Sequence, residues 1–340
     1  MSQESLKKEI AKIVKIALRE DCAFNDATSD LTIPKNSFIT FEINAREEII
    51  FCGKEIISEV FSQLQNSKKF KNSLLDFKIL AKDGNAVGSQ KSIARGTGDA
   101  KLIFAAERVM LNLIQHLSGV ATLTQKFAQA LGNKKIKILD TRKTLPSYRT
   151  LQKYAVTVGG GKNHRFSLAD MILIKDNHIA AAGSVAKAIA ACKGSKLKIE
   201  VECDTFEQVK EALESKPDII MLDNMKIAEL KKSIKLIGKK AKIEVSGGIS
   251  LENIGSFSEL EIDFISIGSL THSVRAVDIG LDVKKYREID PETSSDLFAQ
   301  TILKTENAKT ENLNPIPTSL PKTLQILPRS SSFRHSLQRH

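Results

Sequence analysis

The stretch KIKILDTRKT, residues 135–144, joins an apolar, strand-like segment to a cluster of charged side chains and indicates how this chain folds. Ile136 to Leu139 have the composition of a buried strand, and Asp140, Arg142 and Lys143 follow at once. Met171 to Ile174, followed by Lys175, repeat the arrangement. Because buried strands of this kind direct their polar ends to one place, the pattern predicts a cationic site on a strand scaffold.

Strand-like runs recur through the second half of the chain, at residues 135–140, 170–176, 196–204, 218–224, 242–248 and 263–269. Helix-like stretches lie between several of them, at residues 180–191, 206–214 and 228–237. Alternating strands and helices predict parallel strands joined by right-handed crossovers.

The polar residues fall at or just past the carboxyl end of each run. They are Asp140, Arg142, Lys143, Lys175, Glu202, Asp223, Ser246, Gly247, Gly248, Gly268 and Ser269. This face holds the active site in an α/β barrel, although a doubly wound sheet gathers ligands at the same ends. About six strands favour an incomplete α/β barrel, short of the eight strands of a full one.

The first part of the chain is different and predicts an α+β, sandwich-like domain over residues 1–115. Helices are expected over 6–19 and 54–65, and strands over 38–45 and 92–104. An apolar helix over 107–131 leads into the barrel domain, residues 116–272, and residues 273–289 are available to pack back on the first domain. Residues 290–340 are rich in Ser, Thr, Asn and Pro and predict a disordered, basic, low-complexity tail, either a solvated extension or a partner-binding segment.

Composition narrows the function classes. The 340 residues are 41% hydrophobic, which is enough for a sizeable core, and the polar N-terminus together with the lack of a long apolar run predicts a cytoplasmic protein without a membrane partner. The four cysteines are scattered and indicate neither a zinc site nor a disulfide framework. The net charge of +11 suits nucleic acid or small anions. Only 5% aromatic residues and no Trp argue against nucleic acid.

Eight motifs, in order, resemble those of the quinolinate phosphoribosyltransferase family. They are ERVMLN (107–112), HLSGVAT (116–122), DTRKT (140–144), GGGKNHR (159–165), IKDNH (174–178), LDN (222–224), SGGI (246–249) and THS (271–273). The resemblance extends to about residue 288 and implies a type II phosphoribosyltransferase-like fold.

The resemblance implies a reaction as well as a fold. Quinolinate and phosphoribosyl pyrophosphate would give nicotinate mononucleotide, pyrophosphate and carbon dioxide in de novo NAD biosynthesis, with Mg²⁺ as cofactor. It also implies a homodimer or larger assembly in which Arg108 reaches the neighbouring subunit's site. Lys143, Glu202 and Asp223 are the candidate catalytic residues, and Glu202 and Asp223 are also candidate metal ligands.

The residue types suit this chemistry. A pyridine dicarboxylate needs fixed cations, and guanidinium groups bind carboxylates bidentately. Backbone N–H groups beside small residues suit the donor's phosphate. The candidate substrate-binding residues are Arg108, Thr141, Arg142, His164, Arg165, Lys175, Ser246, Gly247, Gly248, Gly268, Ser269 and Leu270.

Carboxylates would stabilise the positive charge that builds on the ribose ring during transfer. Glu202 and Asp223 fit that role, or an internal salt bridge with Lys143 or Lys175. Glu200 shares the strand face of Glu202 and is expected to be a supporting inner charge. Decarboxylation is expected to follow coupling, because the ring nitrogen is then cationic.

Several interpretations stay open. His178 and His272 are more often structural than ligand-binding in such positions, and a solvated helix face is favoured for Arg149 and Lys153. Ser147 stands where the family commonly has glycine, so the local turn is in question. The alternative enzymes are a nicotinate phosphoribosyltransferase or the family's branch associated with molybdate transport. A basic nucleic-acid-binding protein is the alternative from another class.

Overall fold

A computed structural model describes residues 2–288, and the predicted tail at 290–340 lies outside these described residues. The first domain is built on a four-stranded antiparallel sheet in the order β12-β1-β5-β3. Its strands are β1 (Ser37–Ala45), β3 (Leu75–Ile79), β5 (Ser92–Asp99) and β12 (Ile279–Glu288). Two short strands, β2 (Ile49–Ile50) and β4 (Ala86–Val87), form a separate pair. The last described strand, β12, therefore completes the sheet of the first domain.

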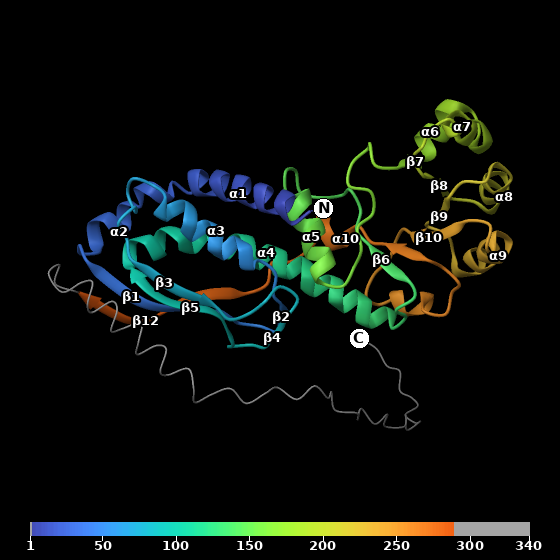
Figure 1. Ribbon diagram of the computed structural model, residues 1–340. Helices are drawn as coiled ribbons and strands as arrows, with labels where there is room; N and C mark the ends of the chain where they lie inside the picture. The colour runs from blue at the N-terminus through green and yellow to red at the C-terminus, as the bar shows by residue number, and fades with distance from the viewer. Residues whose placement is uncertain (1, 289–340) are drawn as a thin grey trace, which may run out of the picture. The chain divides into compact units, whose positions relative to one another are not determined.

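The first domain also contains helices, and the longer ones lie along the sheet (Figure 1). The helices are α1 (Gln3–Glu20), α2 (Ala27–Thr32), α3 (Lys54–Gln65) and the start of α4 (Ala100–Leu131), with a short 3₁₀ turn at Ala23–Asn25. Buried residues of α3 recur at the spacing of a one-sided helix, at Ile56, Val60 and Leu64 among others. The same spacing is visible in the sequence, and the helix predicted over residues 54–65 is confirmed with these bounds.

The long helix α4 corrects the prediction of a strand over residues 92–104. The strand ends at Asp99, whose carboxylate accepts hydrogen bonds from the backbone N–H groups of Lys101 at 2.9 Å and Leu102 at 3.4 Å. Asp99 is thus an N-cap, and the helix begins at Ala100. The helix continues unbroken through the expected domain boundary at residues 115 and 116, from the first sheet to strand β6 of the second (Figure 1).

The second sheet has six parallel strands in the order β6-β11-β10-β9-β8-β7. The strands are β6 (Lys137–Leu139), β7 (Ile172–Ile174), β8 (Ile199–Cys203), β9 (Ile219–Asp223), β10 (Lys242–Ser246) and β11 (Phe264–Ser266). The last strand pairs with the first, as in a barrel, while β6 and β7 remain at opposite edges. The predicted incomplete α/β barrel is therefore confirmed, and it is open between β6 and β7.

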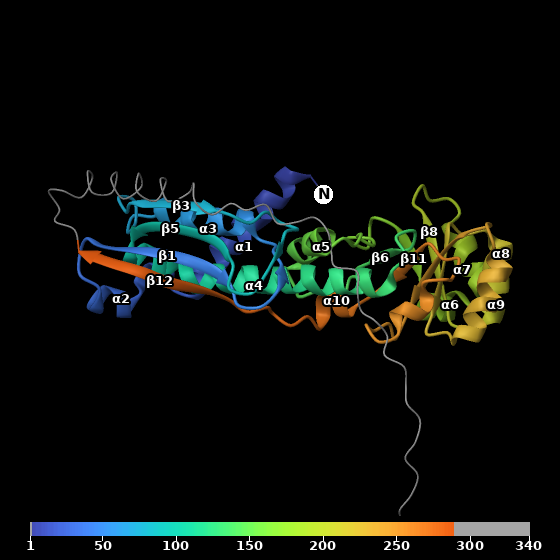
Figure 2. The ribbon, with the colours of Figure 1, turned by 90° about the horizontal axis from the view of Figure 1, so that it is seen from below.

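Helices connect the strands, and α6 (Asp176–Ala182), α7 (Val185–Cys192), α8 (Phe206–Ser215) and α9 (Ile227–Ile237) lie on the outside of this sheet (Figure 2). Helices α5 (Arg149–Val158) and α10 (Ser269–His272) pack against α4 instead, and a 3₁₀ turn lies at Ile254–Phe257. The single helix predicted over 180–191 is wrong, because Gly183, at φ 89°, ends α6 and Ser184 caps α7. None of the described helices is both long and apolar enough to span a membrane.

Candidate active site

A pocket of about 510 Å³ lies at the carboxyl ends of the parallel strands. Its lining residues are Thr141, Arg142, Lys143, His164, Arg165, Leu173, Lys175, Asp176, Glu202, Met221, Asp223, Ser246 and Ser266. Nine of the residues proposed from the sequence are therefore brought together here by strands and loops far apart in the chain. Cationic side chains form one side of the pocket and carboxylates form the other, and the two sides come from different segments of the chain.

The cationic side comes from the segments after β6 and before β7. The Nε atom of Arg142 is buried and has no hydrogen-bond partner among the described residues. Arg165 donates from Nη1 to the carbonyl oxygen of Met171 at 3.1 Å, which fixes its direction. Burial, and then the nearby charge of Arg142, lower the pKa of Arg165. Two guanidinium groups held this close favour an anionic ligand between them.

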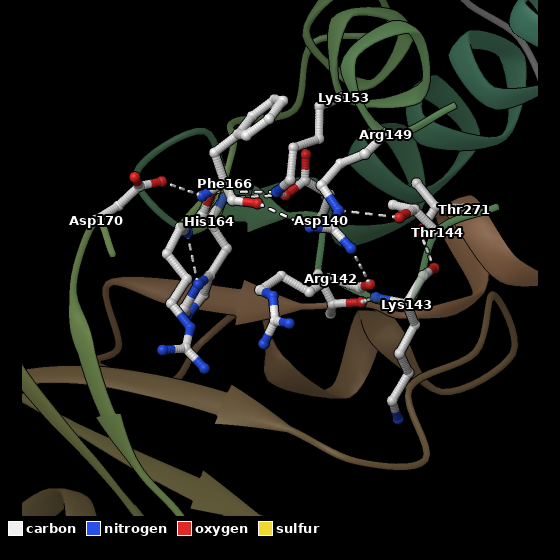
Figure 3. Close-up of polar contacts among 12 residues, drawn as sticks. Asp140, Arg142, Lys143, Thr144, Arg149, Lys153, His164, Phe166, Asp170 and Thr271 are labelled. Carbon is white, nitrogen blue, oxygen red and sulfur yellow. Dashed lines mark hydrogen bonds and ion pairs between the residues drawn. The ribbon is translucent and has the colours of Figure 1, made fainter. Parts of the chain in front are cut away.

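A buried ion pair between Asp140 and Lys153 supports this side (Figure 3). Both side chains are fully buried, so the solvated position expected for Lys153 is wrong. Lys153 also donates to the carbonyl oxygen of His164 at 3.1 Å, and Asp140 accepts from the backbone N–H of His164 at 3.0 Å. Burial raises the pKa of Asp140 to about 6, and the charge of Lys153 opposes this rise. The pair ties α5 and the end of β6 to the peptide that carries His164.

Arg149 was also expected on a solvated helix face, and that prediction is wrong as well. It is partly buried, and its guanidinium donates to the Thr144 hydroxyl at 3.1 Å and to the Phe166 carbonyl at 3.3 Å (Figure 3). Arg149 therefore links the loop after β6 to the segment after His164.

The acidic side of the pocket consists of Glu202 and Asp223, with Asp204 beside them. One carboxylate oxygen from each of the three lies within 4.8 Å of the others. Asp204 follows β8 by one residue and was missed by the sequence analysis, although an acidic residue two positions after Glu202 was a visible signal. Burial, and then the neighbouring Asp223, raise the pKa of Asp204. Lys175 forms an ion pair with Glu202. Of the two lysines predicted as possible salt-bridge partners, Lys143 and Lys175, it is therefore Lys175 that pairs with this carboxylate.

Of the glycine-rich strand ends only Ser246 lines the pocket, and the residues that follow it and those at 268–270 are not among the lining residues. Gly247 has φ 89°, and a Cβ there would lie 2.3 Å from the Asn224 side chain. Gly268 approaches the Lys143 side chain, since a Cβ there would lie 3.3 Å from Lys143 Cδ. Gly248 and Ser269 adjoin these positions, and Leu270 is fully buried.

Three other candidates lie away from the pocket lining. Arg108 is exposed on α4 and is not among the residues that line the pocket of its own chain. The Nδ1 atom of His178 accepts from the backbone N–H of Lys175 at 2.9 Å, which is the structural role favoured for it. His272 Nδ1 lies 2.5 Å from the hydroxyl oxygen of Ser273.

Ser147 adopts the left-handed conformation, with φ 63°. The turn therefore keeps the backbone shape that glycine adopts without cost. Ser147 is therefore a strained residue in the loop between β6 and α5.

An open parallel barrel with an anion-binding pocket at its strand ends is the architecture of an α/β enzyme acting on multiply charged substrates. Two family models match the chain: quinolinate phosphoribosyl transferase, N-terminal domain, over residues 26–118, and the C-terminal domain of the same family over residues 120–282. The chain belongs to the quinolinate phosphoribosyl transferase family.

Individual relatives agree with this assignment. A probable nicotinate-nucleotide pyrophosphorylase (carboxylating) of Bacillus subtilis is 43% identical over 281 residues, covering 81% of this chain and 93% of that protein. A probable enzyme of the same name from Methanocaldococcus jannaschii is 41% identical, covering 83% of this chain and 100% of its own length. The crystal structure of NadC from Streptococcus pyogenes has a TM-score of 0.76 at 38% identity, covering 83% of this chain and 97% of that one.

Proposed function

We propose that this protein transfers the phosphoribosyl group of phosphoribosyl pyrophosphate to quinolinate and removes carbon dioxide, giving nicotinate mononucleotide for NAD biosynthesis. The observation that carries the proposal is the buried Arg142 Nε, which has no partner among the described residues and lies in a pocket with Arg165. A buried donor without an acceptor is costly. A carboxylate of a pyridine dicarboxylate supplies that acceptor.

The two sides of the pocket give each substrate a place. Quinolinate's carboxylates bind at Arg142 and Arg165, with Lys175 adjacent, which orients the ring nitrogen toward the donor. The donor's 5-phosphate binds at the backbone N–H groups of residues 246–248 and 268–270, where glycine allows close approach. His164 and Thr141 complete the quinolinate side.

Transfer breaks the bond between the anomeric carbon and pyrophosphate and forms a bond from that carbon to the ring nitrogen. Positive charge builds on the ribose as pyrophosphate leaves, and Glu202 and Asp223 stabilise it. Lys143 neutralises charge on the departing pyrophosphate. The ring nitrogen, now cationic, then stabilises the electron pair left on the adjacent carbon when carbon dioxide departs, and a proton replaces the carboxylate.

The cluster of Glu202, Asp204 and Asp223 fits a divalent cation, because three carboxylates within 4.8 Å supply the oxygen ligands that Mg²⁺ prefers. Mg²⁺ bound there would neutralise negative charge on pyrophosphate. Glu202 would then bind the metal in place of its ion pair with Lys175, and Lys175 could bind substrate.

We also propose that the active enzyme is a homodimer or a larger assembly in which Arg108 completes the partner's pocket. Its exposed position on α4, outside the pocket of its own chain, supports this. Mixing two inactive variants, Arg108→Ala and Lys143→Ala, should restore activity as hybrids form, to about one quarter of native sites in a symmetric dimer. No recovery after verified subunit exchange would contradict a shared site. The cytoplasmic location expected from the sequence stays a prediction.

Substrate identity is tested by turnover. Purified protein is given phosphoribosyl pyrophosphate and Mg²⁺ with either quinolinate or nicotinate, and nicotinate mononucleotide and carbon dioxide are measured. The proposal predicts product from quinolinate with one carbon dioxide per nucleotide. Turnover of nicotinate alone would assign the protein to the monocarboxylate reaction. Turnover of neither substrate would contradict the proposed function and leave only the fold assignment in place.

A further inference from the structure

A buried cluster of three ionisable side chains lies under the pocket, and two of them, both glutamates, have no part in the mechanism above. His164 comes from the segment before β7, Glu200 from β8 and Glu244 from β10. Their side chains are 7%, 0% and 1% exposed. The Nε2 atom of His164 lies 3.0 Å from an oxygen of Glu200 and 3.5 Å from an oxygen of Glu244. Only His164 reaches the pocket lining.

The protonation state of His164 follows from its other ring nitrogen. Nδ1 accepts a hydrogen bond from the backbone N–H of Arg165 at 2.7 Å. An accepting Nδ1 carries no hydrogen, so the hydrogen of the neutral ring is on Nε2 and faces the two carboxyl groups. Burial lowers the pKa of His164, which also favours the neutral ring.

One oxygen of each carboxyl group lies within 4.8 Å of the other, and both oxygens of Glu200 and Oε1 of Glu244 are buried without a hydrogen-bond partner among the described residues. Among the described residues, no Lys or Arg nitrogen comes within 4.0 Å of either one. Two ionised carboxylates side by side in a low-dielectric interior repel strongly and offer only acceptors to one another. One hydrogen between them removes the repulsion and completes a hydrogen bond.

We propose that Glu244 stays protonated in the working enzyme and donates a hydrogen bond to Glu200, and that this pair receives the Nε2–H of His164 and so positions the His164–Arg165 peptide against quinolinate. Glu244 and Glu200 are positioning residues, because neither reaches the pocket. The kinetic part of the proposal rests on the proposed function, whereas the protonation state does not.

The surroundings of Glu244 agree with a protonated side chain. The groups that face it are Glu200 from β8, His164 and the hydroxyl of Ser266 from β11. Burial, and then the charge of Glu200, raise the pKa of Glu244 to about 8. Below this pH the pair holds its hydrogen, and above it the two carboxylates repel. The His164–Arg165 peptide then loses its anchor at the His164 ring, and the KM for quinolinate rises.

The matched variants are Glu244→Gln, which keeps the size and a hydrogen-bond donor, and Glu214→Gln, the same change at an exposed position on α8. The first measurement is the infrared C=O stretch of a buried, protonated carboxylic acid at pH 7. It should be present in the unaltered protein and in Glu214→Gln and absent in Glu244→Gln. Because this readout does not need turnover, a missing band in the unaltered protein would overturn the proposal even if the enzyme is active. A band with no enzyme activity would overturn only the proposed function.

The second measurement is the KM for each substrate between pH 6 and 9.5. The unaltered enzyme and Glu214→Gln should show a KM for quinolinate that rises about 10-fold above pH 8, with little change in the KM for phosphoribosyl pyrophosphate. Glu244→Gln should lose this rise and keep its kcat within about 3-fold. A Glu244→Gln enzyme that retains the rise, or a stoichiometric divalent metal that is lost in this variant, would overturn the proposal.

Discussion

The two sheets of this protein bury different kinds of side chains. The first packs aromatic rings, with Phe61 lying 4.9 Å from Phe77 and 6.1 Å from Phe41 between ring centroids. The second buries ionisable groups in and beside its strands, including Glu244 of β10 and Lys153 of the neighbouring helix α5. We infer from this difference that apolar packing in the first domain stabilises the fold. In the second domain, buried charged groups hold the pocket residues in position, at a cost in folding free energy. Substitutions in the two regions should therefore fail in different ways.

The largest expected effect is on folding. Phe61→Ala removes a fully buried ring and should lower the free energy of unfolding by about 3–5 kcal/mol, because a cavity replaces ring contacts. Denaturant unfolding measures this loss. Leu31→Ala is the control, since Leu31 is 88% exposed and its removal should cost little. The folded fraction of the Phe61 variant should keep the native KM for quinolinate, and a large change in that KM would contradict the division between the two regions.

The next effect is on binding alone. Arg142→Lys keeps the charge but removes the Nε donor, so the KM for quinolinate should rise about 10- to 100-fold, the equivalent of a charge-assisted hydrogen bond. The free energy of unfolding should stay unchanged. Arg275→Lys, on an exposed side chain paired with Glu47, is the control and should behave like the unaltered enzyme. Equal KM values for both variants would remove Arg142 from the site.

The pH dependence of stability follows from Glu244. Its pKa is raised from 4.5 to about 8 in the folded protein, so this group's contribution to stability is fully present below pH 4.5 and is lost as the pH rises through 8. Glu244→Gln cannot ionise. Over this range its free energy of unfolding should therefore fall less with pH than that of the unaltered protein, as measured by denaturant unfolding at several pH values. Parallel curves for the two proteins would show that Glu244 does not titrate in this range.

The smallest effect concerns the strained turn beside the pocket. Ser147→Gly should raise the free energy of unfolding by up to about 1 kcal/mol, because glycine adopts the φ of 63° without steric cost. Thermal unfolding would detect this gain. Ser147→Ala keeps the Cβ atom and should give no gain, so an equal gain for both variants would point to the hydroxyl rather than the backbone.

The sequence predicted the features that depend on local pattern. Apolar runs followed by charged residues, serine or glycine located all six parallel strands, since both signals lie within a few positions of each other. The helix start at Ala100 and the break at Gly183 were missed although Asp99 and Ser184 are recognisable caps. In both places an apolar composition was given more weight than the capping residue.

Features that depend on long-range packing could not be predicted in the same way. Lys153 is buried because α5 places it against Asp140, and no spacing in the sequence shows that contact. Glu244 carried a partial signal, since the tripeptide Ile-Glu-Val occurs at residues 199–201 and again at 243–245. A glutamate between β-branched residues of a buried strand points inward, but that the two glutamates meet follows only from the sheet.

The central claim is that the cationic side of the pocket is built for a pyridine dicarboxylate. The most direct test is calorimetric measurement of Kd for quinolinate and for nicotinate under identical conditions. The second carboxylate should add about 2–3 kcal/mol through charge-assisted hydrogen bonds, so quinolinate should bind at least about 30-fold more tightly. Equal affinities, or tighter binding of nicotinate, would contradict the claim.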